Sequence, residues 1–356
     1  MRRINGWADL TPGGEAAEGP AEWGPIPLTS SLTLTLAVER WPIAGSFAIS
    51  RGTKTEAVVV VAELGDGKAC GRGECVPYAR YGESVDSVTA ALEAMRVPLA
   101  DGLDRASLQK AMPPGAARNA LDCAFWDFEA KRSRRPVHEL AGLPAPHALI
   151  TALTVSLGTP AAMAEAAMRG AAHALLKVKL GGDGDPARIA SVRAAAPEVM
   201  LIVDANESWD DCNLEANLAA CAQAGVALVE QPLPDGRDQA LAGLKRLIPV
   251  CADESVHDRA SLPPLAGKYD AVNIKLDKTG GLTEALATAA QAERLGFSIM
   301  AGCMVATSLA MAPAMLVAQK ALYVDLDGPL LLARDRFDGL AYRDGLVFPA
   351  TPALWG

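Results

Sequence analysis

The hydrophobic positions of the chain follow two different rhythms, and the first begins at residue 31. The segment SLTLTLAVERW alternates apolar and polar residues, and EAVVVVAEL follows after a short polar stretch. A period of two is typical of half-buried strands, so these segments predict an antiparallel pair. Helical stretches follow over residues 84–96 and 115–133. Together they predict a small α+β domain over residues 31–148.

The second rhythm begins near residue 150, where short apolar segments alternate with Ala- and Leu-rich stretches of helical character. The apolar segments are ITALTVS, LLKVKL, LIVDAN, ALVEQP, VCADES, AVNIKL, SIMAGC and LYVDLD. Strands repeated at this spacing predict an α/β barrel over residues 149–328. In the stretch after LLKVKL, Asp185 is the expected helix N-cap and Pro186 the first helical residue.

Residues 1–30 differ from both parts. They are rich in Gly, Pro, Glu and Ala without an apolar period, which predicts a flexible leader. They also lack the apolar stretch of a secretory signal, and no run in the chain approaches the roughly 18 apolar residues of a membrane span. We therefore expect a cytoplasmic protein without a membrane segment.

Charge and cysteine content exclude further classes. The net charge of −9 argues against a nucleic-acid partner, which requires a basic surface. The 7 cysteines form no C-x-x-C pair, and the 4 histidines lie outside any metal-ligand spacing. We therefore expect reduced thiols and no zinc site.

Charged residues lie near the end of most of the apolar segments, on the face opposite the bulky aliphatic neighbours. They are Lys179, Asp204, Glu230, Asp253, Lys275 and Asp325. The strands of a barrel end at one rim, and barrel enzymes build their active sites there. The sequence therefore predicts an active site at this rim.

Three carboxylates come from consecutive predicted strands and should converge: Asp204, Glu230 and Asp253. At about 4.5 Å and an effective dielectric of roughly 20, three such pairs repel by about 11 kcal/mol in sum. A divalent cation resolves this repulsion. An all-oxygen ligand set without His or Cys favours Mg²⁺, with Mn²⁺ as a substitute.

Two lysines, Lys177 and Lys179, share one face of LLKVKL, opposite Leu176, Val178 and Leu180. At about 7 Å apart they repel by about 2.4 kcal/mol, so we expect them to face the carboxylate cluster and its metal. Mutual repulsion and the cation lower lysine pKa values by about two units, whereas the carboxylates act the other way. One lysine is therefore a candidate base.

Lys275 comes from a strand across the barrel mouth from Lys179. A substrate carboxylate on the metal between them would present its α-carbon to a base on each side. Removal of the α-proton leaves an enediolate that a metal stabilises, and return of a proton on the other face gives the epimer. The predicted reaction is a 1,1-proton transfer.

The motifs that carry these residues resemble a known family. KVK at 177–179, DAN at 204–206, EQPLP, ADES and NIKLDKTGG resemble the muconate-lactonizing subgroup of the enolase superfamily. DLDGP at 325–329 is similar to the dipeptide epimerases. The longer strings GECVPYARYGES, GAARNALDCAFWD, LIVDANESW and NIKLDKTGGLTEAL resemble L-Ala-D/L-Glu epimerases of bacterial murein peptide recycling.

The resemblance implies a modified TIM barrel of (β/α)7β type with an N-terminal α+β capping domain, to which residues 329–356 return. It implies an isomerase that inverts the α-carbon of the C-terminal residue of a small dipeptide. Lys179 and Lys275 would be its acid/base pair. The Mg²⁺ ligands that it implies are Asp204, Glu230 and Asp253.

Further residues receive roles from the same resemblance. Lys177 would contact the substrate carboxylate and hold down the pKa of Lys179. Asp325 and Asp327 would bind the α-ammonium group of the dipeptide. The residues expected to lie behind the metal ligands are Asn206 and Asp277.

The resemblance also implies that loops of the capping domain close over the mouth and contact the rest of the substrate, and the candidates are residues 41–52 and 73–84. In them, Arg51 or Arg80 would bind the glutamate side-chain carboxylate bidentately, or else be a solvated surface residue. Cys303 would line the pocket or fill a small buried space. The preferred dipeptide and a homo-oligomeric state are left open.

Two alternatives remain. A cycloisomerase or o-succinylbenzoate synthase would share both lysine strands, but its substrate has no ammonium group for Asp325 and Asp327. A non-catalytic binding module would keep the fold without the chemistry, although the lysine pair and the three acids are all present.

Overall fold

The structure is a computed structural model that describes residues 31–356. The leader predicted for residues 1–30 lies outside the described residues. Within residues 31–356, no helix is both long and apolar enough to cross a bilayer.

An antiparallel sheet forms the base of the N-terminal part. Its strands, in order, are β1 (Thr33–Ile49), β2 (Gly52–Gly65) and β3 (Cys70–Cys75). The predicted antiparallel pair is confirmed by the register of β1 and β2, in which Val38 faces Val60. The expected loop over residues 41–52 is instead mostly strand, because β1 continues to Ile49 after a register shift beyond Pro42.

Helices cover one face of this sheet. They are α1 (Val85–Glu93), α2 (Arg96–Ala100), α3 (Arg105–Ala111), α4 (Ala116–Ser133) and α5 (Val137–Leu140). The helix predicted over residues 84–96 ends earlier, at Glu93, and Ser84 is its N-cap through a capping box with Ser87. Helix α4 matches its prediction and is buried along most of its length against β2 and β3.

Eight parallel strands form the predicted barrel. In neighbour order from one end they are β5 (Leu153–Val155), β6 (Leu175–Lys179), β7 (Met200–Asp204), β8 (Leu228–Glu230), β9 (Val250–Ala252), β10 (Ala271–Ile274), β11 (Ser298–Gly302) and β12 (Tyr323–Asp325). The N–H of Ala152 donates to the carbonyl of Val324 at 2.8 Å, which brings the two edge strands together. Leu175, Ile202 and Leu228 pack in one buried cluster, so apolar side chains fill this part of the barrel.

The connections between barrel strands are mostly helical. They include α6 (Pro160–Arg169), α7 (Asp185–Ala195), α8 (Leu214–Gln223), α9 (Leu276–Thr279), α10 (Leu282–Arg294) and α11 (Ser308–Ala318). The prediction that Asp185 caps α7 is wrong, because Gly184 is the N-cap and Asp185 already belongs to the helix. Its carboxylate instead accepts hydrogen bonds from the N–H groups of Gly181 and Gly182 and from the indole of Trp209.

Beyond the barrel, the chain runs back along the N-terminal part. The short strands β13 (Tyr342–Arg343) and β14 (Leu346–Val347) pair with β4 (Leu149–Ile150), and α12 covers Gly328–Leu331. Arg336 forms ion pairs with Glu39 of β1 and Glu74 of β3. The exact domain boundaries stay a prediction.

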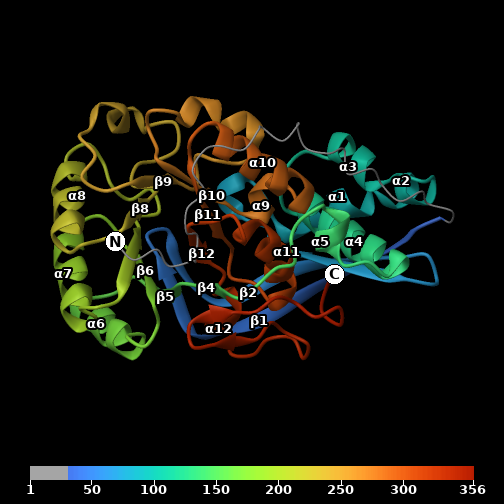
Figure 1. Cartoon of the computed structure of the whole chain (residues 1–356), viewed down its shortest axis with the longest axis horizontal. Coiled ribbons are helices and arrows are strands. Elements are labelled where there is room, and N and C mark those ends of the chain that lie inside the picture. Colours follow the sequence, from blue (N-terminus) through green and yellow to red (C-terminus); the bar gives the residue numbers. More distant parts are fainter. Residues whose placement is uncertain (1–30) are drawn as a thin grey trace.

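Figure 1 shows how these parts are arranged. Helices α1–α4 lie on one side of the molecule, and the barrel with α6, α7 and α8 lies on the other. The long β1–β2 hairpin runs between them, so that its turn reaches the region of β5 and β6. The N–H of Leu157, just after β5, donates to the carbonyl of Ala48 near this turn at 3.0 Å. The hairpin therefore extends from the N-terminal sheet to the barrel.

Close packing of α4 on β3 generates a first prediction. A Cβ atom at Gly73 would lie 2.0 Å from the carbonyl oxygen of Ala120, a backbone atom of α4. We expect Gly73→Ala to lower the free energy of unfolding by about 3 kcal/mol in urea denaturation. At Gly65 the nearest atoms to such a Cβ lie 3.6 Å away, so Gly65→Ala is the control. Equal unfolding midpoints for the two variants would contradict this packing.

Candidate active site

Three carboxylates converge where consecutive barrel strands end. Asp204 is the last residue of β7, Glu230 is the last residue of β8, and Asp253 directly follows β9. The parallel register aligns Asp204 with Glu230, because both strands end at one rim. Ligand oxygen atoms of the three acids all lie within 4.8 Å of one another, and all three residues are buried. The convergence predicted from the sequence is confirmed.

The electrostatics of this cluster fit a divalent cation. Burial, followed by the charge of Asp204, raises the pKa of Glu230 to about 8. Burial would also raise the pKa of Asp253, but Lys275 and Lys278 outweigh it and hold that pKa well below its ordinary value. Three buried carboxylates without a His or Cys neighbour in the cluster form a hard, all-oxygen donor set of the kind that Mg²⁺ prefers.

Lysines surround the three acids. The Nζ atom of Lys177 lies 2.7 Å from carboxylate oxygens of both Glu230 and Asp325. Lys179 lies 2.6 Å from Asp204, and Lys275 lies 2.6 Å from Asp253.

The fall in pKa predicted for the pair Lys177 and Lys179 is wrong for Lys177 in the protein chain itself. Burial lowers the pKa of Lys177, but Asp325, Glu230 and Asp204 outweigh it and hold the pKa well above its ordinary value. The pKa of Lys275 is also raised well above its ordinary value, because Asp253 and Glu230 outweigh burial. The carboxylates determine the direction of these pKa shifts because they lie within 2.7 Å of the ammonium groups. The sequence alone does not give these distances.

A fourth lysine was missed by the sequence reasoning. Lys278 is buried, and its ammonium group donates to the carboxylate and the carbonyl of Asp253 and, at 3.0 Å, to the carbonyl of Asn273. Burial lowers its pKa. The motif KLDK places a second lysine three residues after Lys275. It indicates that both lysines reach the same acid only if a helix is known to begin directly after Lys275, as α9 does. One turn of helix brings Lys278 back to the same acid as Lys275.

The same helix explains where Asp277 lies. Its carboxylate accepts hydrogen bonds from the N–H of Val76 at 3.0 Å and from the side-chain amide of Asn119 at 2.8 Å. Both partners belong to the N-terminal part of the chain, so Asp277 lies at the contact with that part and not behind the metal ligands as expected. The alternation of a strand no longer applies at residue 277, because α9 has begun. Burial raises the pKa of Asp277 to about 7.

A tight turn follows Asp204. Asn206 and Glu207 both have left-handed backbone conformations, with φ values of 45° and 64°. The N–H of Asn206 donates to the carboxylate of Asp204 at 2.9 Å. Its carbonyl accepts from the Ser50 hydroxyl at 2.9 Å and from Arg51 at 3.0 Å. Asn206 thus connects a metal-site acid to the β1–β2 turn.

Two aspartates expected to bind an ammonium group lie at and just after β12. One oxygen of Asp325 accepts from Lys177 at 2.7 Å, and its other oxygen is buried without a hydrogen-bond partner among the described residues. Asp327 accepts from the N–H of Thr154 at 2.7 Å, and burial together with Asp325 raises its pKa to about 7. Burial also raises the pKa of the Cys303 thiol, with Asp325 and Asp327 as the next causes.

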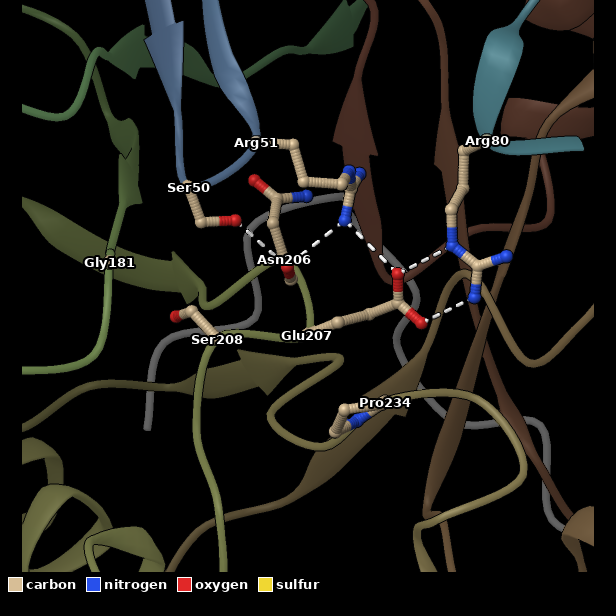
Figure 2. A pocket seen from close by; sticks show the side chains of 8 residues that line it. All are labelled: Ser50, Arg51, Arg80, Gly181, Asn206, Glu207, Ser208 and Pro234. Atoms are coloured by element: carbon tan, nitrogen blue, oxygen red, sulfur yellow. Dashed lines mark hydrogen bonds and ion pairs between the residues drawn. The ribbon is translucent and has the colours of Figure 1, made fainter.

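The two candidate specificity arginines line one pocket at the barrel rim (Figure 2), with a volume of about 430 Å³. Arg51 donates to Glu254 at 2.7 Å and to the hydroxyl of Tyr78 at 3.1 Å. Arg80 donates to both oxygens of Glu207, each at 2.8 Å. Neither is a simple solvated arginine, because both are bonded to acids that the sequence reasoning did not single out.

The fold and the site define the chain as a capped α/β barrel with an acidic metal-binding cluster flanked by lysines. Two family models match it, the mandelate racemase / muconate lactonizing enzyme N-terminal domain over residues 31–142 and the enolase C-terminal domain-like model over residues 160–352. The chain belongs to the mandelate racemase / muconate lactonizing enzyme family of the enolase superfamily.

Particular relatives are also similar over most of their length. An L-Ala-D/L-Glu epimerase from Escherichia coli is 48% identical over 88% of this chain and 98% of its own. An N-acetyl-D-glutamate racemase from Pseudoalteromonas is 47% identical over 84% of this chain and 95% of its own. A solved enolase family member from Agrobacterium tumefaciens, bound to sodium and L-Ala-L-Glu, is 55% identical with a TM-score of 0.90 over 91% of this chain and 100% of its own.

The acidic cluster leads to a prediction about Mg²⁺. We expect Mg²⁺ to raise the melting temperature, because an ion at a hundredfold excess over its Kd stabilises the folded state by about 2.7 kcal/mol. Glu230→Gln should lose most of this shift in a thermal denaturation series with and without Mg²⁺. The control is Glu293→Gln, which changes an exposed acid paired with Lys320. A full-sized shift in Glu230→Gln would contradict the assignment.

Proposed function

We propose that this chain is a Mg²⁺-dependent dipeptide epimerase that acts on L-Ala-D/L-Glu and inverts the α-carbon of the C-terminal residue. The observation that carries the proposal is the placement of two lysines around the acidic cluster. Lys179 and Lys275 come from the ends of β6 and β10, and the acids come from the three strands between them. Each lysine is paired with a different acid, at 2.6 Å. The identity to the Escherichia coli epimerase supports the substrate.

In this mechanism one lysine removes the α-proton and the other lysine returns a proton on the opposite face. Lys179 removes or returns the α-proton on one face of the substrate carbon, and Lys275 acts on the other face. Asp204, Glu230 and Asp253 would hold a Mg²⁺ ion, which would act as a Lewis acid and stabilise negative charge on the substrate carboxylate. The lysine that is neutral when the substrate binds acts as the base, so it decides which epimer can lose its α-proton.

Supporting groups complete the site. Lys177 is buried among carboxylates and contributes a fixed positive charge beside the metal ligands. The unpartnered oxygen of Asp325 is an acceptor available to the α-ammonium group of a dipeptide. Asp327 lies two residues further along and supplies a second carboxylate. We infer that this pair selects substrates with a free amino group.

The competing activity is racemisation of an N-acetylated amino acid. One oxygen of Asp325 is already bonded to Lys177, so the charge of this acid is partly balanced without a ligand ammonium group. Racemisation of an N-acetylated glutamate, the activity in the name of the Pseudoalteromonas relative, uses the same proton transfer without an amino group. The epimerase and racemase names of these relatives favour 1,1-proton transfer over the lyase alternative.

We also propose that the enzyme acts in the cytoplasm. All 7 cysteines are free, which fits a reducing compartment.

The two-base mechanism predicts an isotope pattern. In D₂O with Mg²⁺ and L-Ala-L-Glu, deuterium should enter the α-carbon of the C-terminal residue as the D-epimer appears, which proton NMR measures. Lys275→Ala should slow epimerisation by about 10²- to 10⁴-fold, while one epimer still exchanges its α-proton through Lys179. Lys320→Ala, at a surface ion pair, is the control. Loss of exchange from both epimers in a folded Lys275→Ala chain would rule out separate bases.

The ammonium assignment predicts the effect of substrate acetylation. N-acetyl-L-Ala-L-Glu should have a kcat/KM about 10- to 100-fold below that of L-Ala-L-Glu, because a charge-assisted hydrogen bond to Asp325 or Asp327 is lost. N-acetyl-L-glutamate is assayed beside it. Equal turnover of acetylated and free dipeptide would remove the two aspartates from this role, and preferred turnover of N-acetyl-L-glutamate would favour the racemase.

A further inference from the structure

Glu207 connects three separate parts of the chain at the barrel rim. Its carboxylate accepts two hydrogen bonds from Arg80, each at 2.8 Å, and one from Arg51 at 3.2 Å. It also accepts the backbone N–H of Asp235, in the loop after β8, at 2.9 Å. Arg51 lies in the β1–β2 turn and Arg80 lies between β3 and α1. Figure 2 shows the Glu207 carboxylate between the two arginines.

The surroundings of Glu207 fix the direction in which its side chain points. Its side chain is 9% exposed, so little water competes for its oxygens. Its backbone N–H donates to the carbonyl of Gln231 at 2.9 Å, which fixes the turn against the end of β8. The left-handed backbone at residues 206 and 207 turns the chain sharply after Asp204. An extended chain at these positions would carry the side chain elsewhere.

The same turn is attached to the metal site. Asn206 donates to Asp204 through its N–H and accepts from Ser50 and Arg51 through its carbonyl. A movement of the hairpin turn away from the barrel must therefore break bonds to both Asn206 and Glu207. The hairpin also places the Phe47 ring 5.8 Å from the Nζ atom of Lys179. The position of the hairpin thus decides whether Phe47 covers Lys179, one of the two proposed bases.

We propose that Glu207 is a positioning residue, which holds Arg51 and Arg80 against the rim and so keeps the β1–β2 turn and the β3–α1 loop closed over the substrate site. This role rests on the proposed function and deepens it. Glu207 does not touch the reacting carbon. It acts through the two arginines, and its loss opens the cover without removing a base or a metal ligand.

The chain offers a matched control for this ion pair. Arg259 donates to both oxygens of Glu284, at 2.9 Å and 2.8 Å, which reproduces the two-bond geometry of Arg80 and Glu207. Both control residues lie in the barrel part of the chain, so this pair joins no loop of the N-terminal part to the rim. Glu284→Gln therefore removes an equivalent charge pair without affecting the cover.

The experiment compares Glu207→Gln, Arg80→Gln, their double variant and Glu284→Gln. Initial rates with L-Ala-L-Glu and L-Ala-L-Leu give KM and kcat for each chain. Opening of the cover should raise KM by about tenfold for both dipeptides in Glu207→Gln, with kcat changed far less, because charge-assisted bonds are lost. The double variant should be little worse than Glu207→Gln alone, since that variant already loses the charged partner of Arg80.

A second measurement needs no activity. Trypsin cleavage after Lys54, whose side chain lies over Tyr78 and not against Glu207, reports opening of the hairpin. We expect faster cleavage in Glu207→Gln and Arg80→Gln, and the wild-type rate in Glu284→Gln. If the wild-type chain turns over neither dipeptide, the proposed function fails, whereas the cleavage rates still decide the role of Glu207.

Three results would overturn the proposal. Unchanged KM and unchanged cleavage in Glu207→Gln would leave Glu207 without a role in closure. A lower KM for L-Ala-L-Glu alone would mean that Glu207 competes with the substrate carboxylate for the arginines. Equal acceleration of cleavage in Glu284→Gln would mean that the effect is general destabilisation.

Discussion

Charge balance among buried side chains is the constraint on which the site depends. Four carboxylates face four ammonium groups at the barrel rim. Each of these ammonium groups has a carboxylate oxygen within 2.7 Å. The carboxylates are those of Asp204, Glu230, Asp253 and Asp325, and the ammonium groups are those of Lys177, Lys179, Lys275 and Lys278. Leaving one buried charge without its partner costs several kcal/mol. A metal ion that binds Asp204, Glu230 and Asp253 must therefore compete with the lysines that already pair with these acids.

The barrel makes this balance possible through its geometry. Parallel strands deliver their charged side chains to a common rim, and the register that aligns Lys179 with Asp204 and Asp204 with Glu230 fixes the order of charges around it. Apolar side chains fill the barrel beneath, so the charged layer lies between a dry core and the covering hairpin. The reactive groups are thus placed by strands, whereas the groups that contact the cover lie in turns and loops.

This division also explains what the sequence could predict. The alternation of strands and the common rim were sufficient to place the acids and the paired lysines, because those residues obey a simple period. Lys278 and Asp277 escaped the same reasoning, since α9 begins directly after Lys275 and changes the period. The period of strands and helices also did not identify the acids that bind Arg51 and Arg80. Glu207 lies in a turn with positive φ, and no strand or helix period predicts the direction of its side chain.

The return of the chain to its N-terminal sheet affects how the protein is made. Glu74 in β3 is 1% exposed, and its carboxylate is compensated by Arg336, 262 residues further along. During synthesis from the N-terminus, this acid has no cationic partner until nearly the whole barrel has left the ribosome. The N-terminal sheet therefore reaches its final stability only after the barrel is available, and the two parts mature together despite their separate positions in the sequence.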